Sequence, residues 1–462
     1  MPYHNAPSQR FSKSTAAMCN TTVVGPSAAP GATATATATA SESSGAKRRK
    51  VGCARTRRRS RLILADIDEA AVATAKAPDS HGMSAGAARD HGTGGTDVAP
   101  PVFFMVGSQR SGSNWLETMI NLSPDVSGPQ PPHILKNWAP LVVNYGDLTV
   151  PGNYRALQDH VLAFVEAAPL PLVDAAGAPI AFERGAFAAR VAKCVQRSAS
   201  KKPSLVAILE AVFETEAEAH GKKTWICKSL TNIVHHAQLL EHFGTRRLRY
   251  IYLRRDPRDV CLSFKKCKSV GDDHYYVIAR RWAHLQEQAL AVEAANPALF
   301  FSVSYEELLN QRDFTMWHFF QFSGLEEPAN GYDGAKTSAR CERAAKGSER
   351  WGNLTRGRSF VAEQRCKYLK ALEQGEMAPG DVGMIEAVAA GAMRALGYKS
   401  TVTVGAVFSS ADIAEFERLN AEGVRAQRQA LALANPVEAA RVRAQADTLL
   451  AASTVAALVM CY

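Results

Sequence analysis

The chain has 462 residues, of which 46% are hydrophobic and 21% charged, with 54 Lys and Arg against 44 Asp and Glu. This length and apolar content suffice for one large or two ordinary globular domains, and they exclude a wholly disordered chain. No stretch reaches the roughly 18 uninterrupted apolar residues of a membrane-spanning helix, so we expect a soluble protein. The nine cysteines are scattered and never spaced as C-x-x-C, which predicts neither a disulfide framework nor a zinc site and favours a reducing compartment.

Residues 1–98 differ from the rest of the chain in composition. They are rich in Ala, Thr, Ser and Gly, and they carry 13 Lys and Arg against seven Asp and Glu. Such a segment buries too little apolar surface to offset the entropy of ordering, so we predict a disordered basic tail. Up to Arg61 its single acid is Glu42, which is compatible with an organelle transit peptide, a nuclear-localisation patch or a plain solvated linker. We therefore expect a cytoplasmic or organellar protein.

From Pro100 onward, short apolar runs alternate with stretches of helical spacing. The predicted strands are 101–106, 223–228, 248–253 and 299–303. The predicted helices are 114–122, 154–167, 205–220, 234–243, 259–267 and 276–294. Strands that alternate with helices indicate an α/β fold, a three-layer sandwich with a mainly parallel central sheet.

Beyond Tyr398, two Ala-rich segments, 411–433 and 437–458, are predicted to be helices. We interpret them as an appended helical pair rather than as a catalytic domain. The chain is accordingly expected to consist of a tail (1–98), an α/β domain (99–400) and a helical C-terminal extension (401–462).

The segment 107–115, GSQRSGSNW, joins the first predicted strand to the first helix. Its Gly-x-x-x-x-Gly spacing is typical of a phosphate-binding loop, in which glycines let backbone N–H groups approach an anion at a helix N-terminus. Ser113 stands where a nucleoside triphosphatase carries Lys, and Arg110 lies inside the loop instead. The segment therefore predicts phosphate binding and disfavours ATP hydrolysis, the alternative being a simple Gly/Ser turn.

A second strand-to-helix junction is 253–264, LRRDPRDVCLSF. The guanidinium fork of Arg255 and the hydroxyl of Ser263 suit the oxygens of a second phosphate. Pro257 and Asp259 suit the first turn of a helix. In isolation a capped helix with surface arginines explains the segment equally well, but two such junctions in one sheet favour a ligand with two phosphates.

Together the two segments resemble the sulfotransferase family that depends on 3′-phosphoadenosine 5′-phosphosulfate (PAPS). In that family the first loop holds the 5′-phosphosulfate and an R-x-x-x-D-x-x-x-S segment holds the 3′-phosphate. The chain is similar to the family at four further places, in the expected order: 227–230 (CKSL), 303–308 (VSYEEL), 322–325 (FSGL) and 395–398 (ALGY).

The chain also departs from the family pattern at two places. Arg110 replaces the loop Lys of the cytosolic small-molecule enzymes and resembles the tyrosylprotein and several bacterial and algal branches. The late R-K-G-x-x-G segment is matched by Lys346 and Gly347, but Ala345 replaces its Arg. The possible substitutes are Arg343, Arg350 and Arg356.

The resemblance implies PAPS as co-substrate, no metal, and a role for each matching residue. It places Arg110 at the bridging oxygen and leaving phosphate, Lys228 opposite the transferred group, and His133 as general base. The implied donor-binding residues are Arg110, Ser111, Gly112, Ser113, Asn114, Trp115, Arg255, Ser263, Lys346 and Gly347. A strand-end lysine and a loop histidine beside prolines are the structural alternatives for Lys228 and His133.

The last expectations concern the aromatic residues that could stack on adenine and the segments that could form the acceptor pocket. Trp115 or Trp351 would stack on adenine, whereas Trp282 fits the core equally well. Residues 125–222 and the C-terminal extension are expected to form the acceptor pocket and its lid. The predicted activity is sulfation of a hydroxyl or amine on a small molecule; the sequence indicates neither the acceptor nor the oligomeric state.

Two other classes of protein remain open at this stage. One is a kinase-like phosphotransferase, which the missing loop Lys disfavours. The other is a non-catalytic nucleotide-binding protein whose basic tail binds nucleic acid.

Overall fold

A parallel sheet organises the part of the chain that the structure describes. The structure is a computed structural model, and it describes residues 99–267, 271–332, 366–401 and 406–459. The sheet has five strands in the order β2-β3-β1-β4-β5, and every neighbouring pair is parallel. The strands are β1 Val102–Gly107, β2 Val126–Ser127, β3 Thr224–Cys227, β4 Leu248–Arg254 and β5 Phe300–Ser304. Their carboxyl ends therefore share one edge of the sheet, where parallel α/β folds bind ligands.

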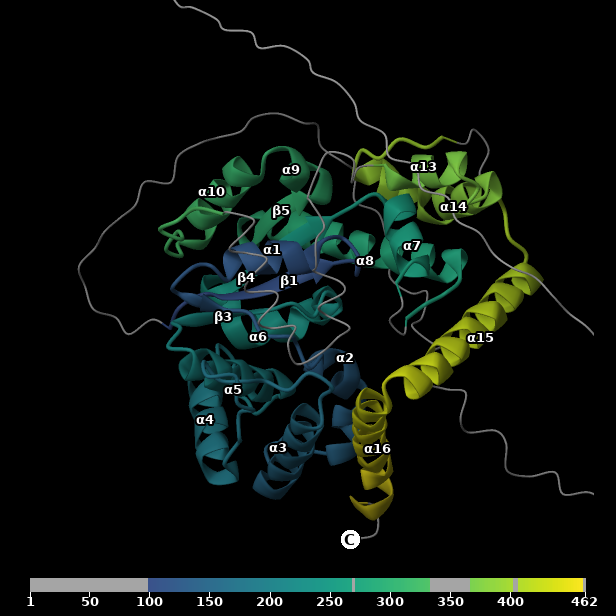
Figure 1. Cartoon of the computed structure of the whole chain (residues 1–462). Coiled ribbons are helices and arrows are strands. Elements are labelled where there is room, and N and C mark those ends of the chain that lie inside the picture. Colours follow the sequence, from purple (N-terminus) through teal and green to yellow (C-terminus); the bar gives the residue numbers. More distant parts are fainter. Residues whose placement is uncertain (1–98, 268–270, 333–365, 402–405, 460–462) are drawn as a thin grey trace, which may run out of the picture. The chain divides into compact units, whose positions relative to one another are not determined.

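The side chains of β1 point alternately to the two faces of the sheet and pack in two separate cores, one on each face. Phe103 and Met105 pack with helices on one face, and Phe104 and Val106 with helices on the other. The first layer consists of α1 Ser113–Ile120, α9 Tyr305–Asn310 and α10 Arg312–Ser323. The opposite layer includes α3 Pro151–Glu166, α5 Leu205–Ala219 and α6 His236–Arg247 (Figure 1). The predicted three-layer α/β sandwich with a parallel sheet is confirmed.

A third core joins helices that flank the carboxyl edge of the sheet. It is formed by α7 Pro257–Lys265, α8 Tyr275–Ala295, α13 Lys367–Glu373 and α14 Pro379–Ala395. Arg258 of α7 is buried and forms an ion pair with buried Glu386 of α14 at 2.6 Å. Glu386 also accepts hydrogen bonds from Ser400 and Thr401. This network attaches the end of the α/β domain to the helix that follows β4.

The predicted strands and helices correspond to β1, β3, β4 and β5 and to α1, α3, α5, α6, α7 and α8. Some boundaries differ. α3 and α7 begin earlier than predicted, at Pro151 and Pro257. Instead of a helix from Val234, the chain forms the 3₁₀ turn η2 Asn232–His235, and α6 begins at His236. The predicted end at Phe243 agrees with the backbone, since Gly244 has a non-helical conformation with φ of 63°. Further elements are α2 Ile134–Trp138, the 3₁₀ helices η1 Ala139–Tyr145 and η3 Pro297–Leu299, and α4 Arg184–Arg197.

The C-terminal segment is helical, as predicted, and consists of α15 Ser410–Ala434 and α16 Pro436–Val459. α15 contacts α8, and α16 contacts η1 and α3. Asn420 of α15 accepts hydrogen bonds from the backbone N–H groups of Asp273 and His274, at 2.7 and 3.0 Å. In the described ranges, no helix is long and apolar enough to cross a membrane. The predicted tail, 1–98, lies outside the described residues.

Candidate active site

The loop between β1 and α1 depends on two glycines. Gly107 has φ of 131°, and a Cβ there would lie 2.2 Å from the carbonyl oxygen of Leu253 on β4. Gly112 has φ of 94°, and a Cβ there would lie 2.5 Å from the ring of Tyr305. The N-cap residue of α1 is Gly112, which has no side chain with which to cap the helix. The loop therefore brings the electropositive end of α1 to the carboxyl edge of the sheet, where it can receive an anion.

Arg110 joins this loop to α7. Its Nε donates a hydrogen bond to Ser263 Oγ at 3.2 Å, and its carbonyl oxygen accepts one from Arg255 at 2.9 Å. The Arg110 backbone has φ of 69°, the left-handed region in which a non-glycine residue is strained by about 1–3 kcal/mol. The two strand-to-helix junctions found in the sequence therefore meet at one place, with both arginines and the serine in contact.

Arg255 is buried at the start of the second junction. Its guanidinium lies 3.4 Å from the Asp259 carboxylate and 4.4 Å from the centre of the Tyr305 ring. The indole Nε1 of Trp282 donates to its carbonyl oxygen at 3.1 Å. Burial raises the pKa of the Asp259 carboxyl, while the charge of Arg255 opposes that rise. These contacts fix the orientation of Arg255, and they place Trp282 in the core rather than at a stacking position.

Lys228 follows β3 and is buried. Its ammonium donates to Asn114 Oδ1 at 2.7 Å and forms an ion pair with Glu117 of α1, which is also buried. A cation and its counterion thus lie at the start of α1, in contact with Asn114.

His133 stands at the N-terminus of α2, and its Nδ1 lies 2.9 Å from the hydroxyl oxygen of Ser229, the residue after Lys228. Its backbone also adopts the left-handed conformation, with φ of 56°. Burial, helped by the charges of Lys136 and Lys228, lowers the pKa of His133 to about 4. The imidazole is therefore neutral at pH 7 and able to accept a proton.

A pH profile tests His133 as a base. Because its pKa is lowered from 6.5 to about 4, the neutral form persists on acidification, and we expect kcat/KM to fall only near that value. A rate measured between about pH 3 and pH 8 should have an acid limb well below the usual histidine range of about 6.5, and a His133→Asn variant should lose that limb. An acid limb at the ordinary histidine pKa would contradict the assignment, provided circular dichroism shows a folded chain throughout.

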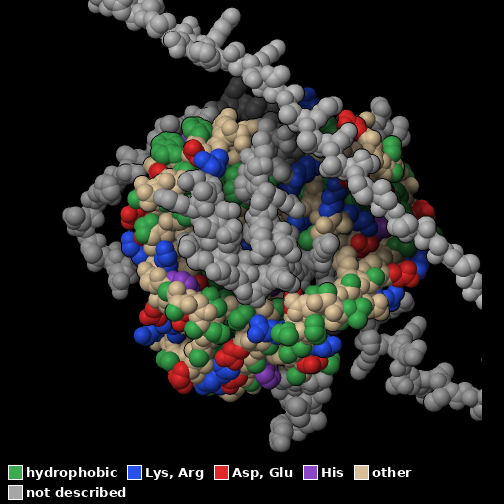
Figure 2. Space-filling model, viewed as in Figure 1, with side chains coloured by type: hydrophobic (Ala, Val, Ile, Leu, Met, Phe, Trp, Pro, Cys, Tyr) green, Lys and Arg blue, Asp and Glu red, His purple; other side chains and the backbone are tan. Residues whose placement is uncertain are grey.

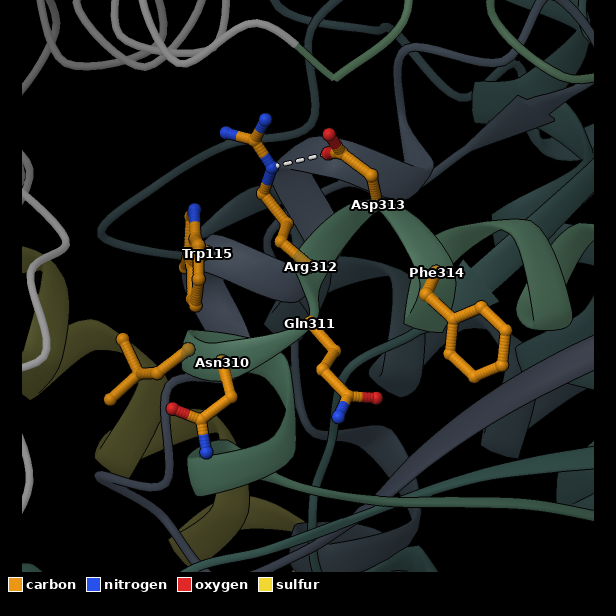
Figure 3. A pocket seen from close by; sticks show the side chains of 7 residues that line it. Trp115, Asn310, Gln311, Arg312, Asp313 and Phe314 are labelled. Carbon is orange, nitrogen blue, oxygen red and sulfur yellow. Dashed lines mark hydrogen bonds and ion pairs between the residues drawn. The ribbon is translucent and has the colours of Figure 1, made fainter.

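A cavity of about 590 Å³ opens beside Trp115. Figure 3 shows the Trp115 ring next to the side chain of Arg312, which forms an ion pair with Asp313, while Phe314 points away from it. The Trp115 ring also meets Tyr305 edge-on at 6.2 Å. The cavity is lined by Trp115, Leu309, Asn310, Gln311, Arg312, Asp313 and Phe314. An aromatic wall with amide side chains suits a flat heterocycle with polar edges.

The remaining predicted residues divide into two groups. Ser111 and Ser113 belong to the loop and to the start of α1, and Ser111 is buried with its hydroxyl 2.7 Å from that of Ser108. Lys346, Gly347 and Trp351, together with Arg343, Arg350 and Arg356, lie outside the described residues.

Tyr305, Ser229 and Asp259 contact the candidate residues, although sequence reasoning assigned them no role in the site. Tyr305 touches both the first loop and Arg255, and it opens the YEEL stretch noted above. Tyr305 directly follows β5, which is parallel to β4, so it lies at the same edge of the sheet as the two loops. This position after a predicted strand is the sequence signal that could have identified it. Figure 2 shows Lys and Arg side chains gathered on the face around α7.

One group of potential metal ligands occurs among the described residues: Cys194, Glu210 and Glu214. Arg197 lies among them, 3.2 Å from Cys194 Sγ and 2.9 Å from Glu210, and it also pairs with Glu214. Its guanidinium supplies positive charge at the position that a metal ion would take. This cluster belongs to α4 and α5 rather than to the carboxyl edge of the sheet.

Comparisons with known proteins agree with this architecture. Residues 101–329 match the sequence model of the Sulfotransferase family, and the chain belongs to that family. A search of curated protein sequences found no match.

Three solved structures are similar at low identity. The sulfotransferase domain of the Synechococcus PCC 7002 olefin synthase is 16% identical, with 66% of this chain and 98% of that one covered and a TM-score of 0.38. The sulfotransferase domain from the curacin biosynthetic pathway is 18% identical, with 65% and 98% covered and a TM-score of 0.40. Sulfotransferase STF9 from Mycobacterium avium is 12% identical, with 65% and 77% covered and a TM-score of 0.31. The family assignment rests on the sequence match, not on these scores.

Proposed function

We propose that this sulfotransferase uses PAPS as donor and sulfates a hydroxyl or amine of a small molecule. One observation carries the donor assignment: the two anion-binding junctions meet through the contacts of Arg110 with Ser263 and with Arg255. A ligand with two separated phosphates fits this pair, with the 5′-phosphosulfate at the first loop and the 3′-phosphate at Arg255 and Ser263. The cavity beside Trp115 would receive the adenine.

In the proposed mechanism, the residues act by positioning and by charge. Sulfuryl transfer forms a bond between the acceptor oxygen or nitrogen and sulfur while the bond from sulfur to the bridging oxygen breaks, leaving adenosine 3′,5′-bisphosphate. Arg110 and the N-terminus of α1 stabilise the negative charge that develops on the leaving phosphate. Neutral His133 accepts the proton that the acceptor loses, and Lys228 faces the transferred group.

Calorimetric titration of the full chain with adenosine 3′,5′-bisphosphate, without metal, tests the donor site. We expect Arg255→Ala to weaken bisphosphate binding by about 30- to 100-fold, because a buried charged hydrogen-bond donor is lost. Arg254→Ala is the matched control, since Arg254 is the neighbouring arginine and pairs with Glu307 at 3.8 Å. Melting temperatures must accompany the titrations, because Arg255→Ala also leaves Asp259 without its ionic partner.

Other outcomes would support the alternatives. Tighter binding of ADP with magnesium than of the bisphosphate would favour a kinase-like phosphotransferase. Nucleic-acid binding that disappears when residues 1–98 are deleted, without any bisphosphate binding, would favour a non-catalytic role. Equal bisphosphate affinity in the wild type and in Arg255→Ala would remove the second junction from the donor site.

A further inference from the structure

Ser229 is a buried residue of the site to which the proposed mechanism gives no role. Only 1% of its surface is exposed. On one side of it, Lys228 donates a hydrogen bond to Asn114 at the start of α1. On the other side, the carbonyl oxygen of Leu230 accepts one from the backbone N–H of Gly107 at 3.2 Å. The segment that carries Ser229 is therefore tied to both ends of the phosphate-binding loop.

The imidazole of His133 is held from two directions. Its backbone carbonyl accepts hydrogen bonds from the backbone N–H and the side-chain amide of Asn137, at 3.1 and 3.0 Å, which fixes the left-handed backbone at the start of α2. Its Nδ1 lies 2.9 Å from Ser229 Oγ. Unlike Ser229, His133 is partly exposed, and its Nε2 has no hydrogen-bond partner in the described part of the chain. Nδ1 is thus committed to a buried hydroxyl, and Nε2 is the nitrogen left for a substrate.

This arrangement limits which nitrogen can act as the base. A neutral imidazole carries its proton on one nitrogen, and only the other nitrogen can accept a proton. If Nε2 receives the proton, Nδ1 must already be protonated, and its partner must accept a hydrogen bond rather than donate one. A serine hydroxyl can do so, because its oxygen has two lone pairs. After the transfer both ring nitrogens are donors, so the Ser229 oxygen keeps the same hydrogen bond while the ring becomes positive.

We propose that Ser229 is a positioning residue for sulfuryl transfer: its oxygen accepts a hydrogen bond from Nδ1–H of His133 and so leaves Nε2 as the base. This inference rests on the proposed function, because it takes His133 as the general base. The O–H or N–H bond of the acceptor breaks, its proton moves to Nε2, and its electron pair forms the bond to sulfur. The bond from sulfur to the bridging oxygen breaks at the same time, and that electron pair stays with the leaving phosphate.

The tautomer of His133 can be measured without any activity. In the full chain with isotopically labelled histidine, the NMR shift of each imidazole nitrogen shows whether it is protonated, and the signals of His133 are those missing from His133→Asn. At pH 7 we expect Nδ1 to be protonated and Nε2 unprotonated. Ser229→Ala should lose this preference, because the hydrogen bond that a ring nitrogen makes sets the tautomer. Protonation of Nε2 in the wild type, or an unchanged tautomer in Ser229→Ala, would overturn the inference.

The rate of sulfation is the second measurement. We expect Ser229→Ala to lower kcat by about 10- to 100-fold, toward the lower end of the roughly 10²- to 10⁴-fold contribution of a general base. Its affinity for adenosine 3′,5′-bisphosphate should not change. Ser229→Thr keeps the hydroxyl and should recover most of the rate. Ser323→Ala is the matched control, because Ser323 is also buried but its hydroxyl donates to the backbone carbonyl of Phe320 in α10; it should keep the wild-type rate.

The bisphosphate titration separates this inference from the proposed function. A wild-type chain that does not bind the bisphosphate contradicts the proposed donor site, whatever the tautomer of His133. A chain that binds it and sulfates, but whose Ser229→Ala variant has the wild-type kcat, keeps its donor site and overturns only the role of Ser229. The same holds if Ser229→Thr is as slow as Ser229→Ala while melting at the wild-type temperature, since the hydroxyl would then not be what matters.

Discussion

Replacing Arg110 with Ala is expected to lower kcat/KM for sulfation by about 10²- to 10³-fold, the effect of removing one preorganised donor aimed at developing charge. Arg110 is the residue at which both junctions meet, through Ser263 and Arg255. Its strained backbone, with φ of 69°, is the conformation that holds the guanidinium toward α7. The measurement is the initial rate of sulfate transfer from PAPS to a phenol or alcohol that the wild type accepts.

Two companion variants show whether the effect comes from the guanidinium. Arg110→Lys keeps the charge but loses the planar fork, so we expect an intermediate rate. Gln109→Ala changes the neighbouring, exposed residue of the same loop and should leave the rate nearly unchanged. If Arg110→Ala retained the wild-type rate with an unchanged melting temperature, the leaving phosphate would have to be stabilised by another residue.

The regular elements around the sheet could be predicted because local patterns determine them. β1 has a continuous apolar run ended by a glycine, and α3 and α5 have helical spacing over four turns. β2 has two residues, too few for any periodicity, and the structure identifies it only by its pairing with β3. α2 is also too short to show a period. It has five residues, and it follows a proline-rich stretch and His133, whose backbone is left-handed.

The candidate site was partly predictable for a different reason. The glycine spacing and the R-x-x-x-D-x-x-x-S pattern each lie within one short segment, so the sequence reveals them directly. Contacts between distant segments do not follow from such patterns. The meeting of Lys228 with Glu117, and of Tyr305 with both Gly112 and Arg255, depends on strand order and on which loops share the carboxyl edge. The roles of these residues in catalysis remain predictions, as does the contribution of Lys346 and Gly347.

Lys228→Met is expected to destabilise the chain by about 3–5 kcal/mol, because it leaves the buried Glu117 carboxylate without its cation. The double variant Lys228→Met/Glu117→Leu removes both charges and should recover most of that stability, since apolar side chains of similar size replace a buried ion pair at little cost. Urea unfolding of the two variants and the wild type measures this difference.

The same double variant separates the structural from the catalytic role of Lys228. If the ammonium stabilises the transferred group, the recovered fold should still sulfate at least about 10²-fold more slowly than the wild type, because the cation is absent from the transition state. A double variant that is both stable and active would show that Lys228 serves only to neutralise Glu117. Glu117→Leu alone completes the cycle: it keeps the cation while removing its counterion, so a loss of activity confined to the Lys228 variants assigns the chemistry to the ammonium rather than to the ion pair.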